Sequence, residues 1–178
     1  MTGAEPGPAA VSLPELKAFL RIFNDEEDAL LAGMVRSAAA ACEAFTGRLL
    51  IARAVEDILT ASMRWARLGT APVNAIEAVS ELAPDGEETP LAADAFAVDI
   101  DGAGEGWVRL VRPIEAKRVL VHYRAGLTGN AATMPEALRH GIIRLAAHLY
   151  THRDAPADHA PPAAVTALWR PWRRLRLR

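Results

Sequence analysis

Hydrophobic residues recur at three- and four-residue spacing in three stretches of the chain, a pattern typical of amphipathic helices. We predict helices over residues 12–23, 26–46 and 134–153, and a short final helix over residues 163–169 that Pro171 ends. The two long helices carry matching apolar stripes, so we expect them to pack together and form the core of one bundle. The residues of these stripes are Leu31, Met34, Val35, Ala38 and Phe45 in the first, and Leu138, Ile142, Leu145 and Leu149 in the second.

Polar residues and glycine mark the ends of these helices. Ser12, Pro14 and Glu15 form the signature of a capping box at the start of the first helix. Residues 133–136 (Thr-Met-Pro-Glu) repeat this pattern, so we expect Thr133 to cap the third helix. Gly47 directly follows the second helix, where a left-handed backbone commonly ends a helix.

Between residues 50 and 125 the pattern changes to short alternating runs separated by turn residues, which is typical of antiparallel strands. We therefore predict an α+β fold that is mainly α: a helical bundle with a small antiparallel β insertion and an extended basic C-terminal tail. The predicted strands cover residues 51–59, 75–82, 96–100, 107–111 and 118–123.

The last eleven residues, 168–178, form a basic tail with five arginines and no acidic residue, a charge of +5. The preceding 167 residues hold 15 basic and 22 acidic side chains, a charge of −7. Arginine pairs with carboxylate or phosphate through two parallel hydrogen bonds, and tryptophan anchors interfaces. We predict that the tail binds a partner. The proposed partner-binding residues are Trp169, Arg170, Trp172, Arg173, Arg174, Arg176 and Arg178.

Three other interpretations of the basic tail are possible from the sequence. The tail could fold back on the acidic surface of its own chain. It could act as a nucleic-acid-binding module, with arginines on phosphates and tryptophans stacked on bases. It could also lie on a membrane surface, although we expect no membrane partner because no apolar run of about 20 residues is evident.

No pattern in the sequence indicates catalysis, a cofactor or a metal. Cys42 lies in an apolar helical stretch and is predicted to be a small core residue. His148 and His152 are four residues apart, but Tyr150, Thr151 and Arg153 around them supply no carboxylate ligand, and no Cys or His cluster completes a ligand set. The run from Gly102 to Gly106 lies between two strands and opens no helix, so it does not form a phosphate-binding loop.

Several segments together resemble the head–tail connector (adaptor) proteins of long-tailed bacteriophages and of gene transfer agents. The order and spacing of the segments carry the resemblance, since each one alone is a capped helix. It extends nearly from end to end, with a looser match over residues 52–117. The matching segments are residues 12–22, 25–31, 43–51, 121–126, 134–153 and 165–174.

We predict a flexible N-terminus over residues 1–11, a connector domain over residues 12–153, and a hinge with a basic docking tail over residues 154–178. Clustered prolines prevent continuation of the helix at the hinge, so we expect residues 163–178 to be separate from the bundle. Because the apolar stripes lie elsewhere, we expect deletion of residues 168–178 to leave the bundle folded.

The resemblance implies a homo-oligomeric ring, expected to be dodecameric, under the portal vertex of the capsid. The expected partners are the portal protein and tail-side connector or terminator proteins, with DNA passing through the ring without sequence-specific binding. The expected location is the bacterial cytoplasm during assembly and then the neck of the particle.

Overall fold

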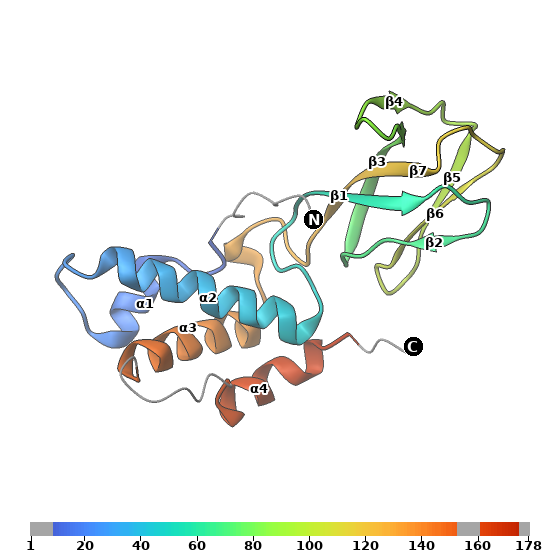
Figure 1. Cartoon of the computed structure of the whole chain (residues 1–178). Helices are drawn as coiled ribbons and strands as arrows, with labels where there is room; N and C mark the ends of the chain where they lie inside the picture. The colour runs from blue at the N-terminus through green and yellow to red at the C-terminus, as the bar shows by residue number, and fades with distance from the viewer. Residues whose placement is uncertain (1–8, 153–160, 175–178) are drawn as a thin grey trace. The chain divides into compact units, whose positions relative to one another are not determined.

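The computed structural model describes residues 9–152 and 161–174, and the chain divides into two compact units (Figure 1). Residues 52–127 form the β unit, and residues 8–51 with 128–178 form the helical unit. Each unit has its own hydrophobic core, and each is described separately below.

Within the described residues, the helical unit contains four α-helices, and the predicted helices are all present (Figure 1). The predicted first helix ends three residues early, at Leu20, and the third begins at Glu136, after a short 3-10 turn. A fourth helix, α4, has the bounds of the short final helix predicted over residues 163–169, and it lies in the segment whose fold class was given as an extended tail. The helices are α1 (Leu13–Leu20), α2 (Asp28–Thr46), α3 (Glu136–Thr151) and α4 (Ala163–Trp169), with 3-10 turns η1 (Ala131–Thr133) and η2 (Arg170–Trp172).

The core of the helical unit lies where α2 packs against α3, as predicted. Leu31 and Ala38 of α2 and Leu138 and Ile142 of α3 have no exposed surface. Cys42 is also fully buried, and this burial raises the pKa of its thiol to about 12. The thiol therefore stays protonated and packs as a small core side chain.

Two of the predicted helix ends are confirmed and one is wrong. Ser12 and Glu15 form the reciprocal capping box at α1, and Gly47 ends α2 with a φ of 67°. Thr133 does not cap α3, because it belongs to η1, where its N–H donates to the side chain of Asn130 at 3.1 Å. The third helix therefore begins directly after Pro135, without a side-chain cap.

The β unit consists of two antiparallel sheets, of four strands in the order β1-β7-β3-β4 and three strands in the order β2-β6-β5. In the larger sheet β7 lies between β1 and β3, with Val121 paired to Asp57 on one side and Val79 on the other. All five predicted strands are present, and the structure adds two short strands, β2 and β4. The strands are β1 (Arg53–Thr60), β2 (Ala66–Arg67), β3 (Val73–Leu82), β4 (Glu88–Pro90), β5 (Phe96–Ile100), β6 (Gly106–Leu110) and β7 (Arg118–Ala125).

The predicted fold class is wrong in its proportions, since the protein is a mixed fold and not mainly α. The seven strands together hold nearly as many residues as the four α-helices. The β segment forms a full unit because its alternating apolar residues bury one another between two sheets, and Val79, Val108 and Val121 are among its buried residues. The extended tail is the second error, because α4 packs on α3.

Helix α2 meets the length and hydropathy expected of a membrane-spanning helix, with 19 residues. We did not expect such a run from the sequence. Long core helices of globular proteins meet the same criterion, and α2 buries Leu31, Val35 and Ala38 inside the helical unit. The expectation of no membrane partner stays a prediction.

Tyr123 of β7 anchors a loop to the β unit through a partly buried hydrogen-bond network. Its hydroxyl donates to the Asp57 carboxylate at 2.9 Å and accepts from the Thr70 N–H at 3.2 Å. The same carboxylate accepts from the Gly69 N–H at 2.7 Å. Burial raises the pKa of the Tyr123 phenol to about 12.

We predict that this phenol makes the stability of the β unit fall at alkaline pH. The unfolded chain loses the phenol proton near pH 10, its ordinary pKa, whereas the folded chain retains it up to about pH 12. The stabilisation is therefore complete below about pH 10 and is lost as the pH rises toward about 12. Urea unfolding across this range should show a fall that the Tyr123→Phe variant lacks. Equal slopes for the two proteins would contradict the prediction.

Candidate partner-binding site

The C-terminal segment (residues 161–174) is fixed to the helical unit by Trp169. This side chain is fully buried, and its indole N–H donates to the Leu138 carbonyl oxygen at 3.4 Å. Gly141 of α3 leaves the space that the indole fills, since a Cβ atom at this position would lie 2.1 Å from Trp169 Nε1. The Phe45 ring of α2 lies beside the indole, with 5.9 Å between ring centroids. Helices α2, α3 and α4 thus meet at one tryptophan.

The residues after Trp169 lie at the C-terminal end of α2. The Arg174 N–H donates to the Thr46 carbonyl oxygen at 2.7 Å, and Arg48 Nε donates to the Trp172 carbonyl oxygen at 3.0 Å. The Arg173 guanidinium lies 5.7 Å from the centroid of the Phe45 ring. The C-terminal end of a helix carries partial negative charge and unpaired carbonyls, so this end of α2 favours the cationic segment.

The predicted partner-binding residues differ in their exposure. Arg170 and Arg173 are exposed, and Trp172 and Arg174 are half-buried. Trp169 is buried in its own unit and has no surface available to a partner in this conformation. Arg176 and Arg178 lie outside the described residues, as does most of the predicted hinge over residues 154–162.

Two sequence expectations about the tail are changed by these contacts. We expected prolines to separate residues 163–178 from the bundle, but residues 163–174 pack on it through α4 and Trp169. We also expected that deleting residues 168–178 would leave the bundle folded. That deletion removes Trp169, one of the largest buried side chains, so it removes part of the core as well.

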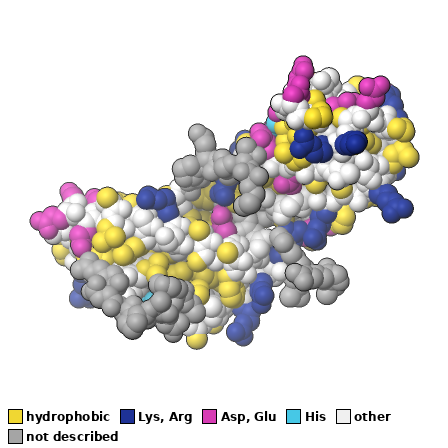
Figure 2. All heavy atoms as spheres, in the orientation of Figure 1, with side chains coloured by type: hydrophobic (Ala, Val, Ile, Leu, Met, Phe, Trp, Pro, Cys, Tyr) yellow, Lys and Arg dark blue, Asp and Glu magenta, His cyan; other side chains and the backbone are white. Residues whose placement is uncertain are grey.

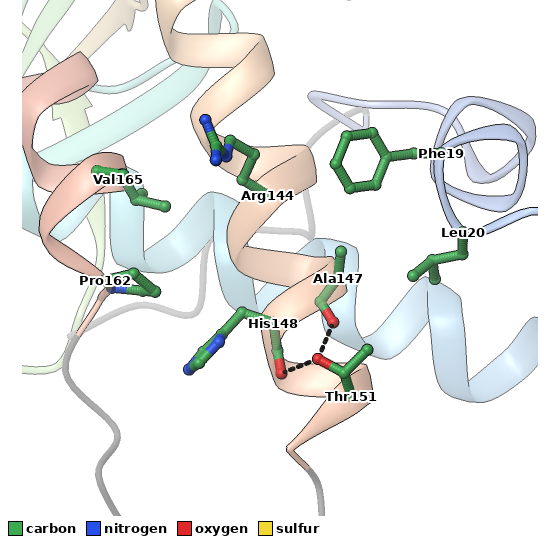
Figure 3. A pocket seen from close by; sticks show the side chains of 9 residues that line it. Phe19, Leu20, Arg144, Ala147, His148, Thr151, Pro162 and Val165 are labelled. Atoms are coloured by element: carbon green, nitrogen blue, oxygen red, sulfur yellow. Dashed lines mark hydrogen bonds between the residues drawn. The ribbon is translucent and has the colours of Figure 1, made fainter.

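A groove of about 380 Å³ lies along α3, between the end of α1 and the start of α4 (Figure 3). Phe19 and Leu20 line one side, Pro162 and Val165 line the other, and α3 forms the floor. Hydrophobic side chains gather over the helices of the helical unit on the face that Figure 2 shows. The lining residues are Phe19, Leu20, Arg144, Ala147, His148, Thr151, Pro162, Ala164 and Val165.

The groove offers no catalytic constellation. The Thr151 hydroxyl donates to the carbonyl oxygens of Ala147 and His148, at 3.1 and 3.2 Å. The rings of His148 and His152 lie 4.1 Å apart. Within residues 9–152 and 161–174, no group of three or more His, Cys, Asp or Glu side chains is placed to hold a metal ion. The expectation of no cofactor or metal stays a prediction.

The glycine run between β5 and β6 serves the fold of the β unit. Gly104 has a φ of 78°, and a Cβ atom there would lie 2.7 Å from Pro72 Cβ. A Cβ atom at Gly106 would likewise lie too close to the side chains of Leu68 and Val73. These contacts explain two of the glycines by close packing, and the absence of phosphate binding stays a prediction.

Sequence reasoning missed the groove and the exposed aromatic residues of both units. Phe23 follows α1 and is 91% exposed, although an aromatic residue four positions after Phe19 looks like a continuation of the helical stripe. In the β unit, Trp65 is 46% exposed and the Arg109 guanidinium lies 5.0 Å from its ring centroid. The polar run over residues 24–28, an asparagine followed by four acidic residues, was the available signal, since it places Phe23 at a surface turn.

Comparison with known proteins shows one family and several similar solved structures. The family model described as phage gp6-like head-tail connector protein matches residues 10–85. A chain in the virion of a native gene transfer agent (GTA) particle is 30% identical, with a TM-score of 0.77, over 99% of this chain and 95% of that chain. No curated protein matches the sequence.

Two chains from GTA necks are also similar over nearly their whole length. One, from the neck of an empty GTA particle with C6 symmetry, is 28% identical with a TM-score of 0.80, over 98% of this chain and 95% of that chain. The other, from the neck of a native GTA particle with C12 symmetry, is 31% identical with a TM-score of 0.73, over 99% and 94%.

The similarity over nearly the whole chain to proteins of GTA virions and necks places this fold among the structural proteins of particle assembly. The chain belongs to the head–tail connector family of phages and gene transfer agents, and it is a structural connector of the neck.

Proposed function

We propose that the protein forms a ring beneath the portal vertex, extends the DNA channel and joins the capsid to the tail. The observation that carries this proposal is the similarity, over 99% of the chain, to a protein from a GTA neck with C12 symmetry. Twelve copies around such an axis give the expected dodecamer. The proposal includes assembly in the bacterial cytoplasm before incorporation into the neck, and no catalytic activity.

We propose that DNA passes through the ring without sequence-specific binding. The β unit has 12 acidic and 8 basic side chains within residues 52–127, a net charge of −4. The chain before the basic tail has a net charge of −7. An excess of negative charge repels the phosphate backbone, and this repulsion keeps a moving duplex from adhering to the protein.

The C-terminal segment is the proposed portal-binding element, and tail-side connector or terminator proteins would occupy another face. Arg170 and Arg173 supply exposed guanidinium groups for carboxylates of the portal, and Trp172 supplies apolar contact area. Trp169 acts from inside the unit by holding this segment against α3. Arg176 and Arg178 are included in the proposal by their charge alone.

Binding of nucleic acid by the C-terminal segment is the second candidate function, favoured by the five arginines of the tail. Of the two proposed stacking residues, Trp169 is fully buried and has no ring face free for a base, which weakens this candidate function. A salt titration separates the candidates, since phosphate contacts give a steep loss of DNA affinity with added salt.

Reversing two exposed charges should test the portal-binding proposal, with circular dichroism to check that the helical unit stays folded, because Arg173 lies against the Phe45 ring. Particles made with Arg170→Glu and Arg173→Glu together are expected to accumulate as DNA-filled heads without tails, because the reversed charges repel the carboxylates that they should pair with. Electron microscopy of the particles and a portal pull-down give the two measurements.

The matched control reverses Arg36 and Arg64, which are exposed arginines of the helical unit and the β unit. This variant should yield tailed particles in normal number. Tailed particles in normal number from the Arg170→Glu, Arg173→Glu variant would overturn the role of the C-terminal segment in portal binding.

A further inference from the structure

We propose that the groove along α3 binds Phe23 of a second copy of this chain, in a head-to-tail contact that continues around the ring. The proposal rests on the ring proposed above and adds the surfaces that join neighbouring copies. The Phe23 loop (residues 21–27) is the inserted element, and the groove between α1 and α4 is its receptor.

Phe23 is the most exposed of the large hydrophobic side chains that the structure describes, with 91% of its surface accessible. When a partner removes an aromatic side chain this exposed from water, the free energy of the bound state falls. The groove supplies apolar surface for it, with the side chains of Leu20, Ala147 and Val165 around a space of about 380 Å³ (Figure 3).

The charges next to Phe23 and those at the groove are complementary. Glu26 is exposed and makes no ion pair within the described part of the chain. Arg144 lines the groove, is exposed, and likewise has no carboxylate partner among the residues the structure describes. Acidic side chains gather at the end of the helical unit where the Phe23 loop lies (Figure 2). An arginine–carboxylate pair between copies would satisfy both residues and fix the orientation of the inserted loop.

The contact joins different surfaces of the two copies, so it is heterologous. Phe23 and Glu26 belong to the loop, whereas Arg144, Ala147 and Val165 belong to the groove. A heterologous contact leaves one loop and one groove free at the ends of every open assembly, and only closure of a ring satisfies them all. This geometry fits a cyclic assembly of identical copies.

A charge-swap experiment on the full-length chain tests the contact by sedimentation. Phe23→Ser, Glu26→Arg and Arg144→Glu should each weaken self-association at least tenfold, which corresponds to about 1.4 kcal/mol. The double variant Glu26→Arg, Arg144→Glu should recover most of the association, because the pair is restored with its charges exchanged. Arg36→Glu is the control, an exposed reversal outside the groove that should associate like the wild type. Circular dichroism checks that each variant is folded.

Mixing two defective variants tests the head-to-tail arrangement. Phe23→Ser retains an intact groove, and Ala164→Arg retains an intact loop while filling the groove with a long side chain. Each should be monomeric alone, and an equal mixture should form dimers but nothing larger. A wild-type chain that remains monomeric at every concentration, or a double swap that recovers nothing, would overturn the contact.

Failure of this contact is distinguishable from failure of the proposed function. Self-association that none of the groove variants changes, together with tailless particles from Arg170→Glu, Arg173→Glu, would overturn the groove and leave the connector role intact. Normal self-association of Ala164→Arg together with tailless particles from that variant would assign the groove to the portal instead, and would also overturn the contact between copies.

Discussion

Trp169→Ala is expected to destabilise the helical unit by about 3–5 kcal/mol, the range for truncation of a buried aromatic core residue. The indole is fully buried, contacts Phe45, and donates a hydrogen bond to Leu138. Alanine leaves a cavity at the point where α2, α3 and α4 meet. Urea unfolding followed by circular dichroism measures the change in the free energy of unfolding.

Trp172→Ala is the matched control, because Trp172 is half-buried and lies three residues further along the same segment. It should cost less, since a partly exposed side chain loses less burial on truncation. If the two alanine variants unfold at the same urea concentration, Trp169 does not have the core role assigned to it.

This expectation also determines how the tail should be truncated. Deleting residues 168–178 removes Trp169, so a loss of head–tail joining after that deletion would report unfolding as well as lost binding. A chain that ends after Arg174 keeps the indole and the Arg174–Thr46 hydrogen bond. The shorter truncation therefore separates the contribution of Arg176 and Arg178 from the stability of the unit.

Gly141→Ala is expected to destabilise the helical unit by about 1–3 kcal/mol through overpacking. Alanine favours a helix more than glycine does, so propensity alone predicts the opposite sign. The added methyl group would lie 2.1 Å from Trp169 Nε1, and the indole or the helix must therefore move.

A double-mutant cycle confirms that the indole causes the loss. In the Trp169→Ala background the space beside position 141 is open, so Gly141→Ala should become neutral or stabilising there. An equal loss in both backgrounds would show that Gly141 is required for a reason other than Trp169.

The sequence was sufficient to predict the helices and most strands of this fold. The spacing of Leu31, Val35 and Ala38 predicted their packing against α3, and alternation predicted five of the strands. Local patterns do not report how many strands share one core, so the size of the β unit was underestimated. Two-residue and three-residue strands such as β2 and β4 are too short to show alternation.

The candidate site was predictable in its charge but not in its packing. The arginines and tryptophans near the C-terminus are evident from composition. The family resemblance of the chain is confirmed by its matches to head–tail connectors. That Trp169 packs internally depends on Gly141, 28 positions earlier, and a long-range complementarity of this kind has no local signature. The groove depends on three helices at once and was missed for the same reason.

Burial of Trp169 makes display of the cationic segment conditional on folding. The residues that present Arg170 and Arg173 are ordered by the same indole that completes the core, so a copy whose helical unit is open cannot hold them in place. Under the proposed role, the C-terminal segment loses its conformational entropy when the subunit folds and not when it binds the portal. Under the proposed role, only subunits with a folded helical unit can therefore bind the portal. Unfolded subunits are left out of the growing particle.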